Sequence, residues 1–240
     1  QALGGKSGTV AVYNYKTGEI LCLVSAPSYD PLHVPSDLES SDRYRGAYLN
    51  RFLSSTFPPG SVYKTVTLAA AIETLPDLNS RTWTCTGSVQ LGDDTITCSG
   101  THGEENIYQA LANSCNVAFA EIAEEMGAAT LKAYTEKAGL TSSYSINGLP
   151  TAKGTFQFDS ISANDLGWAG IGQYHDMVNP CSLMVYMGAI ANGGKAAQPY
   201  LIEKIVHPSG WTSSFHLTHK TGTLVEPSTA SQIADMMSNN

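Results

Sequence analysis

The chain has 240 residues, of which 42% are hydrophobic and only 14% are charged, so it is long enough to bury a substantial core. Its net charge of −8, with 13 scattered basic residues, offers no basic patch to a phosphate backbone and argues against nucleic acid as a partner. No stretch approaches the ~18 to 20 apolar residues of a membrane span, and the first five residues show no signal-peptide pattern, so we expect any anchor to lie outside this chain.

The first predicted elements are an antiparallel hairpin and a buried helix. Residues 9–15 and 20–25 are rich in Val, Tyr, Ile and Leu, and a glycine between them suits a tight turn. A turn-rich region then leads to Pro58-Pro59-Gly60, which ends any preceding element. Residues 61–75 are apolar on nearly every face beyond the first turn, which predicts a helix through the domain centre that begins at Ser61.

Shorter elements follow along the chain. Cys85 and Cys98 flank a polar, turn-rich stretch that predicts a hairpin. Apolar residues at helical spacing predict a helix from Phe119 that stops at Gly127, with a shorter helix just upstream. Further predicted helices cover residues 130–138, 179–191 and 227–237, and predicted strands cover residues 200–206 and 211–217.

The five cysteines do not form a dense disulfide framework. Spacing between Cys and His residues matches no common zinc motif, so we expect neither a metal nor a cofactor. A disulfide between Cys85 and Cys98 would staple the predicted hairpin in an oxidising compartment. From spacing alone, two free thiols are an equally good interpretation.

Ser61 and Lys64 form a candidate nucleophile and base. Residues three apart on a helix lie on the same face, and burial in an apolar helix favours a neutral Lys64 amine that can take the Ser61 proton. The alternative is a helix N-cap serine followed by an ordinary lysine, which Ser-x-x-Lys alone would favour. Pro-Pro-Gly before the pair and Ser114-Cys115-Asn116, 53 residues after Ser61, shift the balance toward chemistry.

Four stretches carry a family resemblance: residues 18–31, 50–64, 102–116 and 170–194, which together extend over nearly the whole chain. In these stretches the chain resembles the class B penicillin-binding proteins, the transpeptidase branch of the penicillin-recognising serine enzymes. The resemblance implies a β-lactamase/transpeptidase-like α/β (α+β) fold, with about five antiparallel strands flanked by helices. It also implies that residues 1–240 form one transpeptidase domain, truncated at both ends relative to the family and lacking its C-terminal strands.

The resemblance implies a peptidoglycan D,D-transpeptidase without a cofactor. Ser61 would attack the penultimate D-Ala carbonyl of a stem peptide, expel the terminal D-Ala and pass the acyl group to an amine on a neighbouring strand. β-Lactams would mimic the donor and leave Ser61 acylated. Ser114 would lie in the proton path, and Asn116 would help to hold Lys64 and the substrate amide.

The same resemblance implies partners and a location. The partners are peptidoglycan stem peptides, β-lactam antibiotics and other cell-wall synthesis proteins. The location is the extracytoplasmic face of the bacterial cell membrane, with the anchor outside this chain. Such a location favours the disulfide between Cys85 and Cys98 over two free thiols.

The alternative functions are those of two other kinds of protein with the same fold, a β-lactamase and a β-lactam sensor domain. A β-lactamase commonly deacylates with a dedicated carboxylate, but Glu104 and Glu105 are better explained as solvated loop charges, and no stretch matches a deacylating motif. A β-lactam sensor domain usually carries Ser-x-Val where this chain has Ser-Cys-Asn, which favours the transpeptidase. His102 resembles a structural element before the Ser-x-Asn helix, and Gln173 ends a Gly-rich turn; neither is included in the catalytic set.

Lys220-Thr221-Gly222-Thr223 resembles the third motif of the family, but we expect this match to be a coincidence. The family needs Lys-Thr-Gly on an inner strand beside the nucleophile, where a backbone N–H completes the oxyanion hole. This copy lies only 106 residues after Ser114, and residues 224–230 lead directly into a helix resembling the one that normally precedes the motif strand. We therefore expect the third motif beyond Asn240 and weak β-lactam binding by the present chain.

Overall fold

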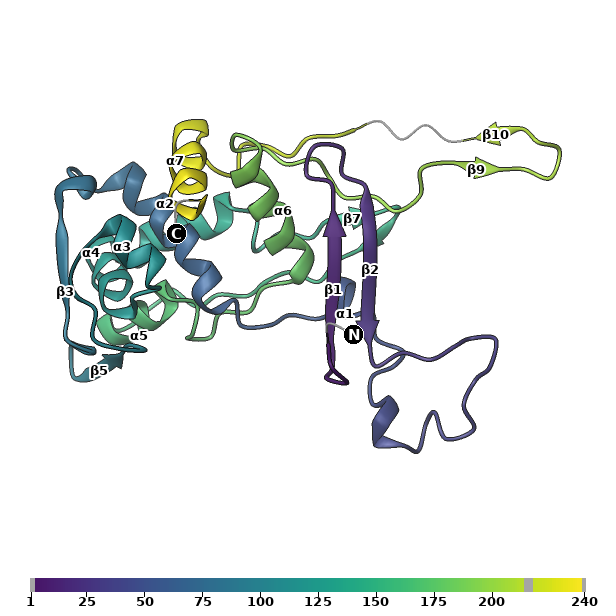
Figure 1. The fold of residues 1–240 in the computed structure, drawn as a ribbon, viewed down its shortest axis with the longest axis horizontal. Helices are drawn as coiled ribbons and strands as arrows, with labels where there is room; N and C mark the ends of the chain where they lie inside the picture. Colours follow the sequence, from purple (N-terminus) through teal and green to yellow (C-terminus); the bar gives the residue numbers. More distant parts are fainter. Residues whose placement is uncertain (1–2, 214–217, 239–240) are drawn as a thin grey trace.

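The computed structural model describes residues 3–213 and 218–238, and the helices α2 to α5 and α7 group at one end of it (Figure 1). The β-hairpin of residues 8–26 lies on the other side of α6, and the segment that carries the short strands at residues 205–206 and 212–213 extends beyond this hairpin. The helices are α1 (Arg51–Ser54), α2 (Lys64–Thr74), α3 (Ile107–Ala112), α4 (Asn116–Lys137), α5 (Ala163–Gly170), α6 (Pro180–Ala191) and α7 (Pro227–Ser238). The strands are β1 (Gly8–Tyr13), β2 (Ile20–Ala26), β3 (Thr82–Cys85), β4 (Ser88–Leu91), β5 (Asp94–Thr97), β6 (Gly103–Asn106), β7 (Ser145–Ile146), β8 (Leu149–Pro150), β9 (Ile205–Val206) and β10 (Thr212–Ser213).

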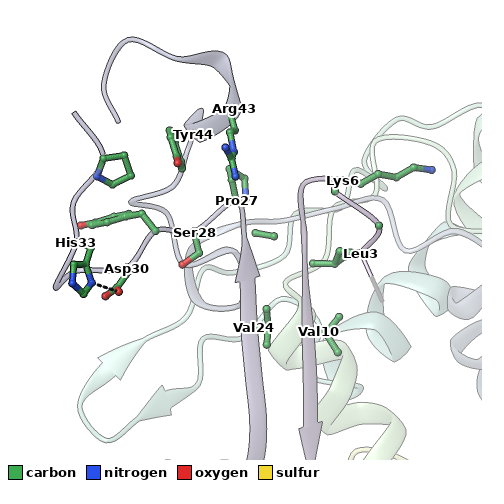
Figure 2. A pocket seen from close by; sticks show the side chains of 15 residues that line it. Leu3, Lys6, Val10, Val24, Pro27, Ser28, Asp30, His33, Arg43 and Tyr44 are labelled. Carbon is green, nitrogen blue, oxygen red and sulfur yellow. Dashed lines mark hydrogen bonds and ion pairs between the residues drawn. The ribbon is translucent and has the colours of Figure 1, made fainter. Parts of the chain in front are cut away.

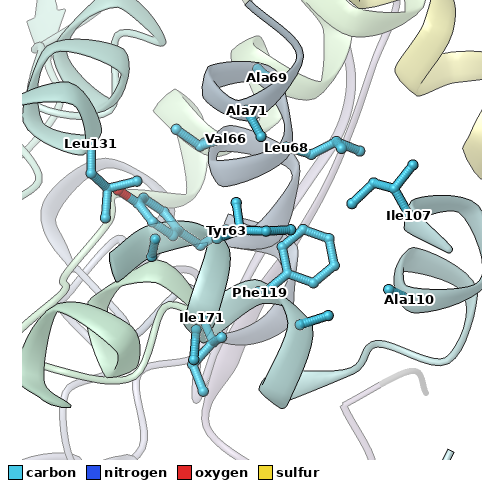
Figure 3. Packing of buried hydrophobic residues seen from close by; sticks show 14 of the residues in the cluster. Tyr63, Val66, Leu68, Ala69, Ala71, Ile107, Ala110, Phe119, Leu131 and Ile171 are labelled. Carbon is cyan, nitrogen blue, oxygen red and sulfur yellow. The ribbon is translucent and has the colours of Figure 1, made fainter. Parts of the chain in front are cut away.

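Helix α2 forms the centre of the main core, as its sequence predicts. Every residue from Lys64 to Ala71 is buried, because this part of α2 is apolar on all sides apart from its lysine and two threonines. Tyr63, Leu68 and Phe119 of α4 pack together in this core (Figure 3). Helix α5 approaches α4 so closely at Gly170 that an added Cβ would lie 2.3 Å from the Ala123 Cβ. Three helices therefore meet with little free space behind the start of α2.

The predicted N-terminal hairpin is confirmed as β1 and β2. The two strands pair antiparallel from Gly8 opposite Ala26 to Tyr13 opposite Ile20, with an irregularity between Val12 and Tyr13. One face of the hairpin packs on α6 in a second, smaller core that includes Ile20, Cys181, Val185 and Ala189. This smaller core connects the hairpin to the helical part of the molecule.

Within residues 3–213 and 218–238 the strands form five two-stranded antiparallel sheets, rather than one sheet of five strands. The predicted hairpin between the two cysteines is confirmed as β4 and β5, and β3 pairs with β6. The predicted strands near 200–206 and 211–217 are reduced to β9 and β10, and residues 214–217 lie outside the described residues. The antiparallel character agrees with the expected fold class.

The predicted disulfide between Cys85 and Cys98 is wrong, because both residues are free thiols. The Cys85 thiol instead donates to the Gly100 carbonyl at 3.5 Å, and the Cys98 sulfur accepts the Asn116 backbone N–H at 3.2 Å. Each sulfur thus has its own hydrogen-bond partner, and the pair is not joined at the ~2.05 Å of a disulfide.

The predicted helices are confirmed with small changes of length, and α1 and α5 are additional. Gly127 has the non-helical angles φ +77° and ψ 160° inside α4, so the chain kinks at the predicted stop and α4 consists of two helical segments. In the part of the chain that the structure describes, no helix is both long enough and apolar enough to cross a membrane.

Candidate active site

Ser61 lies in a tight 3-10 turn, Gly60–Tyr63, that leads directly into α2. The Gly60 N–H donates to the Gly172 carbonyl at 3.0 Å, so the Gly-rich turn after α5 supports this turn from one side. Gly172 has φ +76°, and a Cβ there would lie 2.3 Å from the Gly60 oxygen. The close approach leaves the Ser61 side chain exposed at the start of the buried helix.

The amine of Lys64 is the centre of the candidate site. Its Nζ lies 3.4 Å from Ser61 Oγ and 2.9 Å from Ser114 Oγ. It also contacts the Ser114 carbonyl at 2.6 Å and Asn116 Oδ1 at 2.7 Å. The structure therefore brings together all four side chains that the sequence predicts, with Lys64 between the two serine hydroxyls.

The turn between α3 and α4 positions Ser114 and Asn116. Ser114 has φ +51°, in the left-handed region that non-glycine residues rarely adopt, and this conformation turns the chain back toward Lys64. Asn116 is the first residue of α4, and its Nδ2 donates to the Thr97 carbonyl at 2.9 Å. Because Nδ2 is fixed in this way, Oδ1 is the atom that faces Lys64.

Burial lowers the pKa of Lys64 to about 8, whereas the nearby Cys98 and Cys115 oppose this change. The residue is only 1% exposed, and the Phe119 ring covers it with its centroid 5.7 Å from Nζ. No carboxylate forms an ion pair with Lys64 in the described ranges. The site can therefore supply a neutral amine near neutral pH, placed to take a proton from one serine hydroxyl and return it through another.

Lys220 and its neighbours pair with a different part of the molecule. Lys220 forms an isolated bridge with Ala197, and the Thr221 N–H donates to the Ala196 carbonyl at 2.8 Å. Ala196 belongs to the smaller core with β2 and α6, and no element of regular secondary structure covers residues 220–223. These contacts are compatible with the prediction that the match of residues 220–223 to the third motif is a coincidence. The position of the true third motif beyond Asn240 stays a prediction.

A hollow of about 720 Å³ lies elsewhere, at the open end of the β1–β2 hairpin. Figure 2 shows Leu3, Val10, Val24, Pro27 and Arg43 around it. None of the four predicted site residues lines this hollow. Its position at the hairpin gives it no part in the chemistry of Ser61.

A cluster of sulfur and nitrogen donors that the sequence pattern did not predict lies next to the Ser-Cys-Asn turn. The donor atoms of Cys85, Cys98, His102 and Cys115 all lie within 4.8 Å of one another. Cys115 is buried, and its sulfur lies against the other three donors. The spacing of these residues along the chain matches no short motif. Strands β3 to β6 bring Cys85, Cys98 and His102 together, and the turn before α4 adds Cys115.

Comparison with known proteins gives a consistent result over the whole chain. The family model of the penicillin-binding protein transpeptidase domain matches residues 8–240. The chain is 32% identical to the peptidoglycan D,D-transpeptidase PbpA of Mycolicibacterium smegmatis, over 96% of this chain and 50% of that protein. It is 30% identical to the stage V sporulation protein D of Bacillus subtilis, over 84% of this chain and 31% of that protein.

Solved structures show the same relationship. The penicillin G acyl-enzyme complex of penicillin-binding protein A from Mycobacterium tuberculosis superposes with a TM-score of 0.86 and 28% identity, over 96% of this chain and 56% of that chain. The D,D-transpeptidase domain of a peptidoglycan glycosyltransferase from Eggerthella lenta has a TM-score of 0.86 and 26% identity, over 98% of this chain and 61% of that chain. The present chain thus spans about half the length of the mycobacterial relatives it matches.

Proposed function

This chain belongs to the penicillin-binding protein transpeptidase domain family, and on that basis we propose that it is the part of a peptidoglycan D,D-transpeptidase that carries the nucleophile. The observation that carries the proposal is the position of Lys64 Nζ, 3.4 Å from the exposed Ser61 hydroxyl and 2.9 Å from that of Ser114. A nucleophile and a base within reach of each other are the minimal requirement for acyl transfer.

In the first step, neutral Lys64 accepts the Ser61 proton while Ser61 Oγ attacks the carbonyl carbon of the penultimate D-Ala. The C–O bond forms, the carbonyl π electrons move to its oxygen, and Lys64 becomes an ammonium. The ammonium is then stabilised by the hydrogen bonds that it donates to Asn116 Oδ1, at 2.7 Å, and to the Ser114 carbonyl, at 2.6 Å. The N-terminus of α2 favours the negative charge that develops beside Ser61.

In the second step, the C–N bond breaks and the terminal D-Ala nitrogen receives a proton. Ser114 Oγ is placed to donate it while Lys64 replaces that proton, because Nζ lies 2.9 Å from this hydroxyl. The acceptor amine then attacks the ester, and the same groups run in reverse: the amine proton passes to Lys64 and returns to Ser61 as the ester breaks. A β-lactam would undergo the same attack and the same C–N cleavage, with its ring nitrogen protonated as the ring opens. The nitrogen would stay tethered to the acyl group, so the ester on Ser61 would remain in place of a released leaving group.

The wider setting belongs to the same proposal. We infer that the residues form a single transpeptidase domain that acts on peptidoglycan stem peptides at the extracytoplasmic face of a bacterial membrane, with other cell-wall synthesis proteins as neighbours. The solved relative from M. tuberculosis that forms a penicillin G acyl-enzyme supports the β-lactam part of the proposal.

The experiment that tests the proposal is a time course of the full-length protein with a fluorescent penicillin, followed by mass spectrometry of the labelled peptide. The full-length protein is used because weak β-lactam binding is expected of residues 1–240 alone. We expect a covalent adduct on Ser61 that persists for hours. Release of the label within minutes would instead assign a β-lactamase. Absence of any adduct in the folded, full-length protein would contradict the family mechanism for Ser61.

The rate of β-lactam acylation should rise with pH. Only neutral Lys64 can accept the Ser61 proton, and its pKa of about 8 leaves about 1% of the amine neutral at pH 6 and about half at pH 8. The second-order rate constant should therefore increase about tenfold per pH unit between pH 6 and 7 and level off above about pH 9. Stopped-flow acylation across this range measures it, and a flat profile from pH 6 to 8 would remove Lys64 as the base.

A further inference from the structure

Four metal-ligating side chains converge directly behind the Ser-Cys-Asn turn. Cys85 ends β3, Cys98 follows β5, His102 precedes β6, and Cys115 is the residue before α4. Their sulfur and ring-nitrogen atoms all lie within 4.8 Å of one another. Strand pairing assembles the set: in β3–β6, Cys85 lies opposite Gly103, the neighbour of His102.

We propose that Cys85, Cys98, His102 and Cys115 form a four-ligand site for Zn²⁺. Three thiolates and one imidazole are a common structural zinc set, with Zn–S bonds of about 2.3 Å and Zn–N bonds of about 2.0 Å, so donor atoms around one ion stand about 3.5 to 3.8 Å apart. Cys98 Sγ and His102 Nδ1 are already 3.8 Å apart. The remaining donors need to move inward by no more than about 1 Å to complete a tetrahedron.

The surroundings of the cluster favour a cation. Cys85 and Cys115 are fully buried, whereas Cys98 and His102 are partly exposed and give an ion a way in. The expectation that Glu105 is a solvated loop charge is wrong, because it lies on β6 and is only 2% exposed. Its Oε1 lies 3.2 Å from His102 Nδ1, in an ion-pair contact that is not a well-formed hydrogen bond. Its other oxygen accepts from Asn113 Nδ2 at 3.0 Å. Nδ1 is the ring nitrogen next to both Cys98 and Glu105, so it would carry no proton when bound to the ion. The divalent ion would then balance the charge of the thiolates and of this buried carboxylate.

The metal would act on the active site through the chain. Cys115 lies between Ser114 and Asn116, and the Asn116 backbone N–H donates to Cys98 Sγ at 3.2 Å. Ser114 holds a left-handed conformation that needs support from its surroundings. A metal bound to Cys98 and Cys115 would hold the middle of this turn directly, and its Asn116 end through the N–H bond to Cys98, and so position the groups that contact Lys64. This second part rests on the proposed function, whereas the metal site itself does not.

The experiment uses the purified protein, reduced, treated with a chelator and titrated anaerobically with Co²⁺ and then Zn²⁺. We expect one equivalent of Co²⁺ to give the visible bands and thiolate charge-transfer absorption of a tetrahedral site, and Zn²⁺ to displace it. Cys98→Ser and His102→Ala, both at partly exposed positions, should weaken binding by more than the 10- to 100-fold typical of an outer-shell change. Cys22→Ser and Cys181→Ser, which alter the two cysteines outside the cluster, should bind as the unaltered protein does.

The Co²⁺ spectrum is read on the unaltered protein, so the test does not depend on the folding of any variant. A reduced, folded protein that gives no tetrahedral thiolate spectrum would overturn the site, as would Cys98→Ser and His102→Ala variants that retain full affinity. The site would also be overturned if the isolated protein contained a disulfide among the three cysteines and took up no metal after that disulfide was reduced. With Zn²⁺ bound, penicillin acylation should be at least about tenfold faster than without it. If the protein binds Co²⁺ but neither its metal-bound nor its metal-free form is acylated, the metal site is supported and only the proposed function is rejected.

Discussion

Replacing Ser61 with alanine should abolish covalent labelling by a fluorescent penicillin, while the protein stays folded. The Ser61 hydroxyl is exposed at the start of α2, and within residues 3–213 and 218–238 its one hydrogen bond is to Lys64 Nζ at 3.4 Å, so its removal costs little packing. Without this oxygen the proposed mechanism has no atom to form the ester, because it assigns Ser114 Oγ, 2.9 Å from Lys64 Nζ, to proton transfer. Gel fluorescence and intact-protein mass spectrometry measure the adduct.

The matched control is Ser80→Ala, which removes an exposed hydroxyl that donates to the Asp77 carbonyl at 2.8 Å. We expect this variant to label at the rate of the unaltered protein. Thermal unfolding should show that both variants melt within a few degrees of it. An adduct of undiminished yield in the Ser61→Ala variant would assign the nucleophile to another residue and end the present mechanism.

The part of the site that the sequence predicts best is local. Ser61 and Lys64 are three residues apart at the start of one helix, so the helix geometry alone brings hydroxyl and amine to the same face. The burial of Lys64 also follows from the sequence, because the residues after it are almost entirely apolar. The depressed pKa then follows from the burial.

The contact between Lys64 and the Ser114 turn could not be predicted from spacing. It depends on a serine with φ +51° and on Asn116 Nδ2 donating to Thr97 at the end of β5. Neither feature has a local signature, so the sequence located these residues only through the family resemblance. The catalytic roles of all four residues stay predictions until the variants are measured.

The cysteine cluster shows the opposite error. Pairing Cys85 with Cys98 assumed that two cysteines flanking a hairpin face only each other. In the structure β3 pairs with β6 rather than with β5, so His102 and Cys115 also reach the same place. The order of strands in space, which the sequence pattern does not determine, decides whether such a group is a disulfide or a set of four donors.

Replacing Lys64 with methionine should slow β-lactam acylation by about 10² to 10⁴-fold, the usual contribution of a positioned general base. Methionine keeps most of the apolar stem that packs near the Phe119 ring and removes only the amine. The Ser61 proton then has no acceptor at 3.4 Å, and the Ser114 and Asn116 oxygens lose their shared donor. The measurement is the second-order rate constant for a fluorescent penicillin, taken from pH 6 to 10.

The pH profile distinguishes loss of the base from a general disturbance of the site. In the unaltered protein the rate should rise through the Lys64 pKa of about 8, because deprotonation creates the active amine. In Lys64→Met this rise should disappear, whereas a variant that is merely misaligned would keep it at a lower rate. Lys132→Met is the matched control, since Lys132 is an exposed lysine paired with Asp159, and it should keep both the rate and the profile. A Lys64→Met variant that acylates within about tenfold of the unaltered protein would show that another group takes the Ser61 proton.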